Sequence, residues 1–382
     1  MEMNPSVENL MLKSGSSDDE QRIFNPRRFA LARRRRGYNK IELASVLGLT
    51  RKSINNYESG LAPSSETMAR LAAILKFPES FFYGPDIEEI QTAAVSFRSM
   101  ARMTAARRDE AEAQGSLCIH LNDWFAKRFG MPDADIPDVR HTTPEAAAAV
   151  VRTEWVLGVR PISNMIHLLE SKGVRIFSLS VRASEVDAFS TWKGVTPFIM
   201  LNVQKSSERS RFDAAHELGH LVLHRAGTPT GKEPEGEANR FASAFLMPEA
   251  DVLAHTRKNP SIAALLQWKR RWGVSLAALN YRMHHLDLTT EHHYRNLCIQ
   301  ISAMGGRTAE IDGIARERSL LLEKMLRMLA ADGINRSQIA RELAISTAEL
   351  DEMMFGLTMT AVNGNRASAL PTAHNPAKLQ LV

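Results

Sequence analysis

The stretch Arg211 to His224, RFDAAHELGHLVLH, places two histidines four residues apart in a segment that reads as a helix. Side chains at that spacing lie one above the other on one face of a helix, so His216 and His220 can direct two imidazole nitrogens at one metal ion. Glu217 then lies beside that ion, where its carboxylate can take a proton from an attacking water molecule. The stretch therefore predicts a metal-dependent hydrolytic site.

A working zinc site needs a third protein ligand and one open position. The segment Gly236 to Pro248 reads as a second helix that begins with Glu237, and the polar loop before it would let the two helices lie antiparallel. We therefore expect Glu237 to be the third ligand of a Zn²⁺ ion. Glu233 and Glu235 are competitors that lie farther into the loop, where solvent is the expected surrounding.

His224 extends the histidine face by one more turn of the helix, so we expect it at the edge of the site or at the surface. A pair of core histidines joined by hydrogen bonds, without a metal, is the alternative interpretation of His216 and His220. The apolar residues Leu218 and Leu221 favour a buried helix beside a metal.

The composition describes a multidomain globular chain. At 382 residues the chain is too long for one ordinary core, and it is 44% hydrophobic and 24% charged. No apolar run approaches the roughly 18 residues of a membrane helix, and residues 1–21 lack the apolar core of a secretory signal. We expect a cytoplasmic protein that does not bind membranes.

Two cysteines, Cys118 and Cys298, argue against a disulfide scaffold and fit a reducing compartment. Both are expected to be buried as small apolar residues. A second hypothesis assigns Cys118 a regulatory role, because a cysteine sulfur in the open zinc position would silence the site until it was displaced.

The positive charge is concentrated near the N-terminus. The formal net charge is +5, yet residues 22–58 contain ten Lys or Arg and two Glu. This excess predicts a polyanionic partner.

The same region has the pattern of a helix-turn-helix: Asn39 as N-cap, Gly48 as the turn, and Thr50 capping a second helix that reaches Tyr57. The second helix is polar on one side, as expected for contacts to double-stranded DNA in the major groove. A basic helical face exposed to solvent, with no DNA partner, is the alternative. The predicted DNA contacts are Asn39, Lys40, Arg51, Lys52, Ser53, Asn55 and Asn56.

The expected fold is mainly α with a small β-sheet. Short β-rich runs at 174–179 and 197–203, with a third candidate at 187–192, precede the histidine helix. The expected parts are a disordered N-terminus (1–21), a helix-turn-helix bundle (22–85), a linker helix (86–115), a zincin-like metallopeptidase domain (116–290), a C-terminal helical domain (291–358) and a flexible tail (359–382).

Two further segments leave alternatives open. The cations Lys269 to Arg271 predict a solvated face or a contact to nucleic acid. Residues 335–346 repeat the pattern of residues 39–50, which predicts either a second helix-turn-helix-like module, for DNA or a partner protein, or a packing bundle.

Two resemblances add to this interpretation. Residues 39–83 resemble the Xre-type helix-turn-helix domain, through Leu47-Gly48-Leu49-Thr50 and Ile54 to Gly60. Residues 206–248 resemble the catalytic region of ImmA/IrrE zinc metallopeptidases, through Ala215 to His220 and Glu237 to Ala242, ending in Leu246-Met247-Pro248.

The resemblances imply specific roles. In the metallopeptidase family, His216, His220 and Glu237 would be the zinc ligands and Glu217 the base. Proteins of this two-part build are regulators, several of which cleave a partner repressor after DNA damage or a mobile-element signal. Xre-type domains usually bind DNA as dimers, so a homodimer is expected, and single-stranded nucleic acid is a candidate activator.

Hydrolysis also needs a group that stabilises the developing oxyanion. Tyr281, Arg282, His284 and His285 are the candidates, and packing or solvent exposure is the alternative for each.

These observations lead to one main hypothesis: a DNA-binding zinc endopeptidase that cleaves a repressor-type protein. The alternative is a transcription factor whose metallopeptidase fold senses metal, ligand or nucleic acid without proteolysis. An intact Glu217 favours the first hypothesis, because a pure sensor need not retain it. A zinc hydrolase of small molecules is disfavoured by the attached DNA-binding domain.

Overall fold

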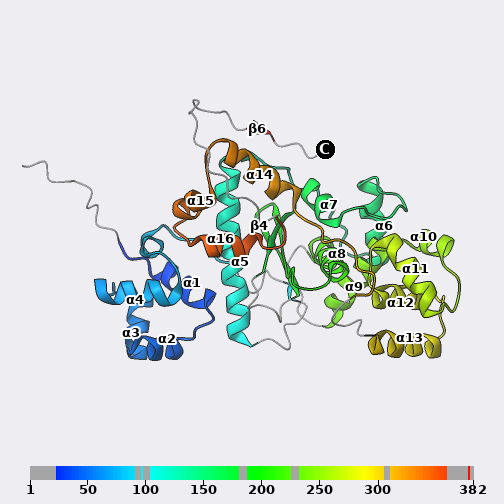
Figure 1. Ribbon diagram of the computed structural model, residues 1–382, viewed down its shortest axis with the longest axis horizontal. Helices are drawn as coiled ribbons and strands as arrows, with labels where there is room; N and C mark the ends of the chain where they lie inside the picture. The colour runs from blue at the N-terminus through cyan, green and yellow to red at the C-terminus, as the bar shows by residue number, and fades with distance from the viewer. Residues whose placement is uncertain are drawn as a thin grey trace, which may run out of the picture.

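The computed structural model describes residues 23–90, 96–97, 104–179, 187–224, 232–304, 310–358 and 377–378. The predicted disordered N-terminus (1–21) and all but two residues of the predicted tail (359–382) lie outside the described residues. Figure 1 shows an N-terminal group of helices at the left, a long helix and a sheet in the centre, and further helices at the right. Helices predominate and the sheet is small, which confirms the predicted α+β fold.

The N-terminal domain is a helical bundle. Leu43, Ile54 and Leu71 meet in its core with no exposed surface. Its elements are α1 (Pro26–Arg35), α2 (Lys40–Leu47), α3 (Arg51–Glu58), α4 (Ser65–Leu75) and the 3₁₀ helix η1 (Glu79–Tyr83).

The turn between α2 and α3 forms as the sequence predicts. Asn39 caps α2 in a reciprocal capping box with Glu42, and Gly48 ends the helix in the left-handed region at φ 65°. Thr50 then caps α3 by accepting a hydrogen bond from the backbone N–H of Ser53. The predicted helix-turn-helix is confirmed.

One long helix, α5 (Ala105–Ala126), runs from the predicted linker helix into the predicted metallopeptidase domain. It crosses the predicted boundary at residues 115–116. Buried positions are spread along its length because α1 packs against it and because Gln114 and Gly115 contact the sheet at Ser178 and Phe189. A Cβ on Gly115 would lie 2.6 Å from Ile90 and 3.0 Å from Phe189, so this glycine permits the close approach.

The main sheet has the strand order β1-β4-β5-β3. Strands β4 and β5 are antiparallel and pair Ser190 with Ile199, whereas β3 and β5 are parallel. The predicted strands at 174–179, 187–192 and 197–203 all form. The strands are β1 (Ser96–Phe97), β3 (Arg175–Ser178), β4 (Ala188–Lys193) and β5 (Thr196–Leu201); a separate parallel pair joins β2 (Phe129–Gly130) to β6 (Ala377–Lys378).

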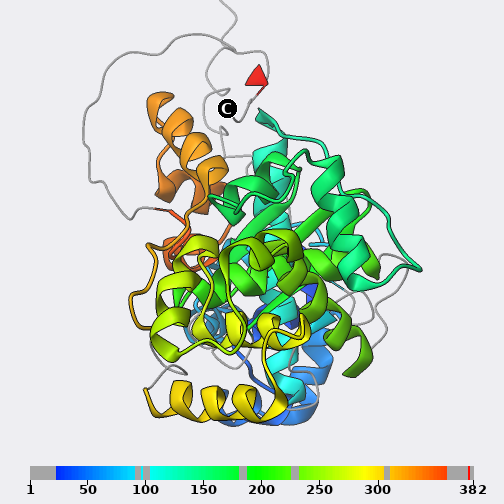
Figure 2. The ribbon, with the colours of Figure 1, turned by 90° about the vertical axis from the view of Figure 1, so that its right-hand side faces the viewer.

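Helix α8 (Ser207–Leu223) lies against this sheet and carries the two predicted metal-binding histidines. Its other side packs on α9 (Lys232–Leu246). Figure 2 looks at the side of the molecule where α10 to α13 lie in front. The remaining helices of this body are α6 (Pro144–Glu154), α7 (Met165–Ser171), α10 (Glu249–His255), α11 (Ile262–Trp272), α12 (Leu276–His285) and α13 (Glu291–Ala303).

The cations Lys269 to Arg271 on α11 all pair with carboxylates. Lys269 is almost fully buried, which fits neither the solvated face nor the nucleic-acid contact expected for it. The pairs are Lys269 with Glu310 at 3.2 Å, Arg270 with Asp312 at 2.8 Å and Arg271 with Asp251 at 2.7 Å.

The C-terminal region consists of α14 (Leu320–Ala331), α15 (Arg336–Glu342) and α16 (Thr347–Met354). Glu170 of α7 ties α14 to the body, since its carboxylate accepts hydrogen bonds at 3.0 Å from the backbone N–H groups of Leu320 and Leu321. Burial raises the pKa of Glu170 to about 7. The second helix of the expected helix-turn-helix-like module, α16, buries Leu350 and Met353, which supports the packing alternative.

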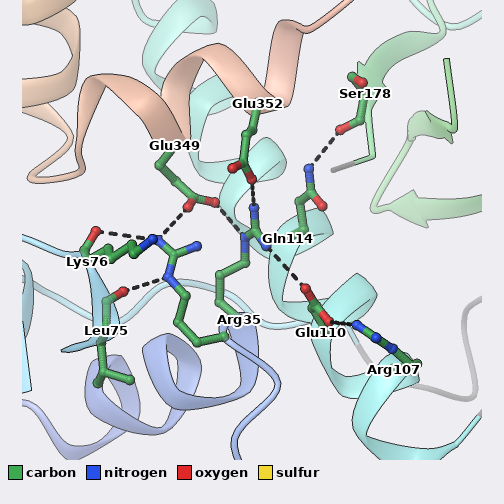
Figure 3. Close-up of polar contacts among 10 residues, drawn as sticks. Arg35, Leu75, Lys76, Arg107, Glu110, Gln114, Ser178, Glu349 and Glu352 are labelled. Atoms are coloured by element: carbon green, nitrogen blue, oxygen red, sulfur yellow. Dashed lines mark hydrogen bonds and ion pairs between the residues drawn. The ribbon is translucent and has the colours of Figure 1, made fainter. Parts of the chain in front are cut away.

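Helix α16 also contacts the N-terminal domain through ion pairs (Figure 3). Arg35 of α1 is fully buried and donates at 2.5 Å to both Glu349 and Glu352 of α16. Arg36 donates to the second oxygen of Glu349 at 2.8 Å, and Glu110 of α5 lies 3.8 Å from Arg35. We call Arg35, Arg36, Glu110, Glu349 and Glu352 the interdomain charge cluster.

Much of the positive charge near the N-terminus is therefore neutralised within the molecule. Arg33 pairs with Glu58 at 2.8 Å and Arg34 with Glu89 at 2.7 Å, while the next two arginines belong to the interdomain charge cluster. The count of ten Lys or Arg in residues 22–58, which predicted a polyanionic partner, is therefore larger than the number of these side chains that lack a carboxylate partner.

Among the helices that the structure describes, none combines the length and apolar composition of a membrane span.

Candidate metal centre and DNA-binding surface

The two histidines of α8 face each other across one turn. Their Nε2 atoms lie 3.1 Å apart, and the side chains are at most a few per cent exposed. Burial lowers the pKa of His220 to about 4, so this imidazole is neutral near pH 7. The neutral imidazole is the form that binds a metal ion.

Glu235, rather than the predicted Glu237, completes the group. The carboxylate of Glu235 lies 3.4 Å from His216 Nε2 and 3.5 Å from His220 Nε2. His216, His220 and Glu235 form one cluster of metal-ligand atoms in the described part of the chain.

The helix start explains the difference. Helix α9 begins at Lys232, four residues before the predicted start, so Glu235 already lies in its first turn. At 100° per residue, Glu235 and Glu237 lie on opposite sides of Ala238. Ala238 packs close to Gly219, where an added Cβ would lie 3.2 Å from the Ala238 Cα. Glu235 therefore faces the histidine pair, and the Glu237 carboxylate contacts His224 at 2.8 Å.

The donor set fits a zinc ion. Zinc–ligand bonds of about 2.0–2.1 Å in a tetrahedral site place neighbouring ligand atoms about 3.3 Å apart. The Nε2 atoms of His216 and His220 lie 3.1 Å apart, Oε2 of Glu235 lies 3.4 Å from His216 Nε2, and Oε1 of Glu235 lies 3.5 Å from His220 Nε2. The Oε2 atom of Glu235 is buried and has no hydrogen-bond partner among the described residues, as expected for an atom reserved for a cation.

Asn239 orients the first histidine. It lies one helical turn after Glu235, and its side-chain oxygen is 3.1 Å from His216 Nδ1. An amide oxygen only accepts, so Nδ1 carries the proton and Nε2 directs its lone pair toward Glu235. The sequence interpretation missed this role, although the four-residue spacing between Glu235 and Asn239 is the signal that could have revealed it.

Glu217 lies next to the histidine pair and is fully buried. Ser190 of β4 donates a hydrogen bond of 2.7 Å to its Oε2 atom. The sheet therefore orients the carboxylate that the sequence predicts to be the base. Ser190 was not predicted, because nothing in a short β-strand indicates which helix residue it will face.

The four candidate oxyanion groups on α12 have other partners. Arg282 donates to the backbone carbonyl of Met247 at 3.0 Å, just beyond the end of α9. His284 lies 3.1 Å from Glu291, and His285 is hydrogen-bonded to the Tyr281 hydroxyl at 2.7 Å. These contacts favour the packing alternative for Arg282 and His284.

Cys118 of α5 does not belong to the cluster formed by His216, His220 and Glu235. It is fully buried, and burial raises the pKa of its thiol. Its charged neighbours are Arg35 and Glu349 of the interdomain charge cluster. This position gives no support to the hypothesis that Cys118 is a regulatory thiol at the zinc site.

The predicted DNA contacts divide into two groups. Arg51, Lys52 and Asn56 are exposed on α3. The others have structural partners in the bundle: Lys40 lies 2.6 Å from Glu58 and 3.0 Å from the Asn55 side-chain oxygen, Asn39 caps α2, and Ser53 bonds to Thr50 at 2.9 Å.

The exposed cations should carry the electrostatic part of DNA binding. We expect Arg51→Ala and Lys52→Ala each to weaken DNA binding and to reduce the slope of log K against log salt by about 1 if each contacts one phosphate. Lys127→Ala, which removes an exposed lysine outside this domain, is the control. Fluorescence anisotropy over a salt series measures both quantities, and slopes equal to wild type for both variants would contradict this assignment.

The chain combines a helix-turn-helix with a cluster of two histidines and two glutamates, and these two features define a DNA-binding regulator with a protease-like domain. Comparison with family models supports both halves. Residues 30–82 match the helix-turn-helix family, and residues 169–284 match a peptidase family described as the IrrE N-terminal-like domain. Both predicted resemblances are confirmed, and the second implies a metallopeptidase. A comparison with curated proteins gave no match.

Proposed function

We propose that this chain is a zinc endopeptidase that binds DNA and cleaves a repressor-type protein, thereby switching gene expression in a stress, DNA-damage or mobile-element response. The observation that carries this proposal is the cluster of His216, His220 and Glu235, whose ligand atoms all lie within 4.8 Å of one another, beside the buried Glu217. The attached helix-turn-helix supports a regulatory substrate.

In the proposed reaction, zinc, Glu217 and Ser190 each have a separate role. When bound, zinc supplies Lewis-acid chemistry that polarises the scissile carbonyl and makes water more acidic. Glu217 accepts the proton of the attacking water and returns it to the leaving amine. Ser190 fixes the Glu217 carboxylate from the sheet side, so the base keeps one orientation during both transfers.

A cleavage assay tests the proposal. Purified protein is incubated with repressors encoded near its gene, first with zinc, then after removal of zinc by a chelator, and again after zinc is restored. We expect one repressor to be cut only in the zinc-loaded samples. Stoichiometric zinc without cleavage of any repressor would instead support the alternative function, a transcription factor that senses metal, ligand or nucleic acid.

Two further expectations follow from the resemblance alone. Homodimerisation on DNA and activation by single-stranded nucleic acid stay predictions. The same assay tests the activator by adding an unrelated single-stranded oligonucleotide to the zinc-loaded protein.

A further inference from the structure

A third histidine continues the line begun by the two candidate ligands. His224 follows the last residue of α8, and its backbone N–H still donates to the carbonyl of His220 at 3.0 Å. The side chains of His220 and His224 therefore remain stacked along one face, with their Nδ1 atoms 3.0 Å apart. On its other side, His224 Nε2 lies 2.8 Å from the Glu237 carboxylate.

The chemistry of these three groups fixes the protons. A carboxylate only accepts, so Nε2 of His224 carries a proton and donates it to Glu237. In a neutral His224, Nδ1 is then an acceptor, and it can only receive the Nδ1 proton of His220. Nε2 of His220 is left with its lone pair, which points toward His216 and Glu235.

The burial of these side chains suits such a series of hydrogen bonds. His224 has only 6% of its side chain exposed, and Glu237 has about one third exposed. The series of hydrogen bonds therefore runs from the partly exposed Glu237 to the buried His220. Asn239 fixes His216 in the same tautomer by a separate route. Both imidazoles therefore keep Nε2 unprotonated: Asn239 sets the tautomer of His216, and His224 sets that of His220.

We propose that His224 and Glu237 are positioning residues that set the tautomer and orientation of His220 for metal binding. The inference rests on the proposed zinc site but assigns a role to two residues that are not ligands. Outer partners of metal-bound histidines typically change metal affinity by about 10–100-fold when they are removed.

Two substitutions of His224 separate this role from packing. His224→Phe keeps a ring of similar size but offers no acceptor to His220, whereas His224→Asn loses the ring and can place an amide oxygen near the position of Nδ1. We expect His224→Phe to lower zinc affinity about 10–100-fold, and we expect His224→Asn to remain closer to wild type. If His224 served packing alone, the order of the two variants would be reversed, and that result would overturn the inference.

Glu237→Gln provides an independent test that does not disturb the helix core. A glutamine presents a donor as well as an acceptor to His224 Nε2, so it no longer fixes the proton on that nitrogen, and His220 Nε2 becomes protonated in part of the molecules. We expect weaker zinc binding in Glu237→Gln and unchanged binding in Glu233→Gln, a matched substitution of an exposed residue one turn earlier in α9.

Zinc affinity is measured on the full chain by competition with a chromophoric chelator at pH 7, and circular dichroism checks folding. If His224→Phe does not fold, the comparison of Glu237→Gln with Glu233→Gln decides, and equal affinities would overturn the inference. If the wild-type protein itself binds no zinc, the proposed function fails first, which distinguishes the two failures.

Discussion

Replacing Glu217 by glutamine is expected to lower repressor cleavage by about 10²–10⁴-fold, the range for loss of a general base, while zinc remains bound. Glutamine has nearly the shape of glutamate, and its side-chain oxygen can still accept the hydrogen bond from Ser190. The substitution thus removes basicity and little else. Initial rates of cleavage and zinc content, measured on the same preparation, check both parts.

Two further substitutions test whether the loss of rate is specific to the Glu217 carboxylate. Ser190→Ala leaves the base in place but frees its carboxylate, so we expect a smaller loss of rate than in Glu217→Gln. Glu233→Gln, at an exposed position, should cleave at the wild-type rate. Cleavage by Glu217→Gln at the wild-type rate would remove this residue from the mechanism.

Replacing Arg35 by alanine should destabilise the protein by about 3–5 kcal/mol, the usual cost of leaving a buried ionic partner behind. Arg35 is fully buried, and so is the carboxylate of Glu349 that it contacts at 2.5 Å. Hydrogen bonds from Arg35 and Arg36 surround that carboxylate. Burial raises the pKa of Glu349, but Arg35 and Arg36 lower this pKa by more than burial raises it. The ion pair therefore persists near pH 7.

The exposed pair of Arg27, which also lies on α1, with Asp86 supplies the control. Its side chains are 74% and 52% exposed, so Arg27→Ala should cost less than about 1 kcal/mol. The double variant Arg35→Met, Glu349→Met should recover part of the lost stability, because it leaves fewer buried charges unpaired. Urea unfolding of the full chain, followed by tryptophan fluorescence, measures these differences. Equal effects of Arg35→Ala and Arg27→Ala would show that the interdomain charge cluster does not hold the domains together.

The sequence predicts what depends on local spacing. Caps and a turn glycine indicate the helix-turn-helix through Asn39, Gly48 and Thr50, and the four-residue spacing of His216 and His220 places both on one face. Each of these features is decided within a few residues of chain, where helix geometry leaves little choice.

Features that depend on where a helix starts, or on what packs against it, could not be predicted in this way. The sequence placed the start of α9 four residues too late and therefore predicted Glu237 as the group that faces the histidines, whereas Glu235 faces them in the structure. The carboxylates that neutralise Arg35 and Arg36 lie more than 300 residues away in the chain, so the sequence overstated the free positive charge. Ser190 likewise meets Glu217 only because β4 packs on α8.

The most direct test of the central claim is the zinc content of Glu235→Gln compared with Glu233→Gln and wild type, after dialysis against a weak chelator. A zinc site with three protein ligands does not tolerate the loss of one of them. We predict that Glu235→Gln retains no stoichiometric zinc, whereas Glu233→Gln retains as much as wild type. A Glu235→Gln protein that is folded and holds zinc at the wild-type level would contradict the metal centre described for this chain.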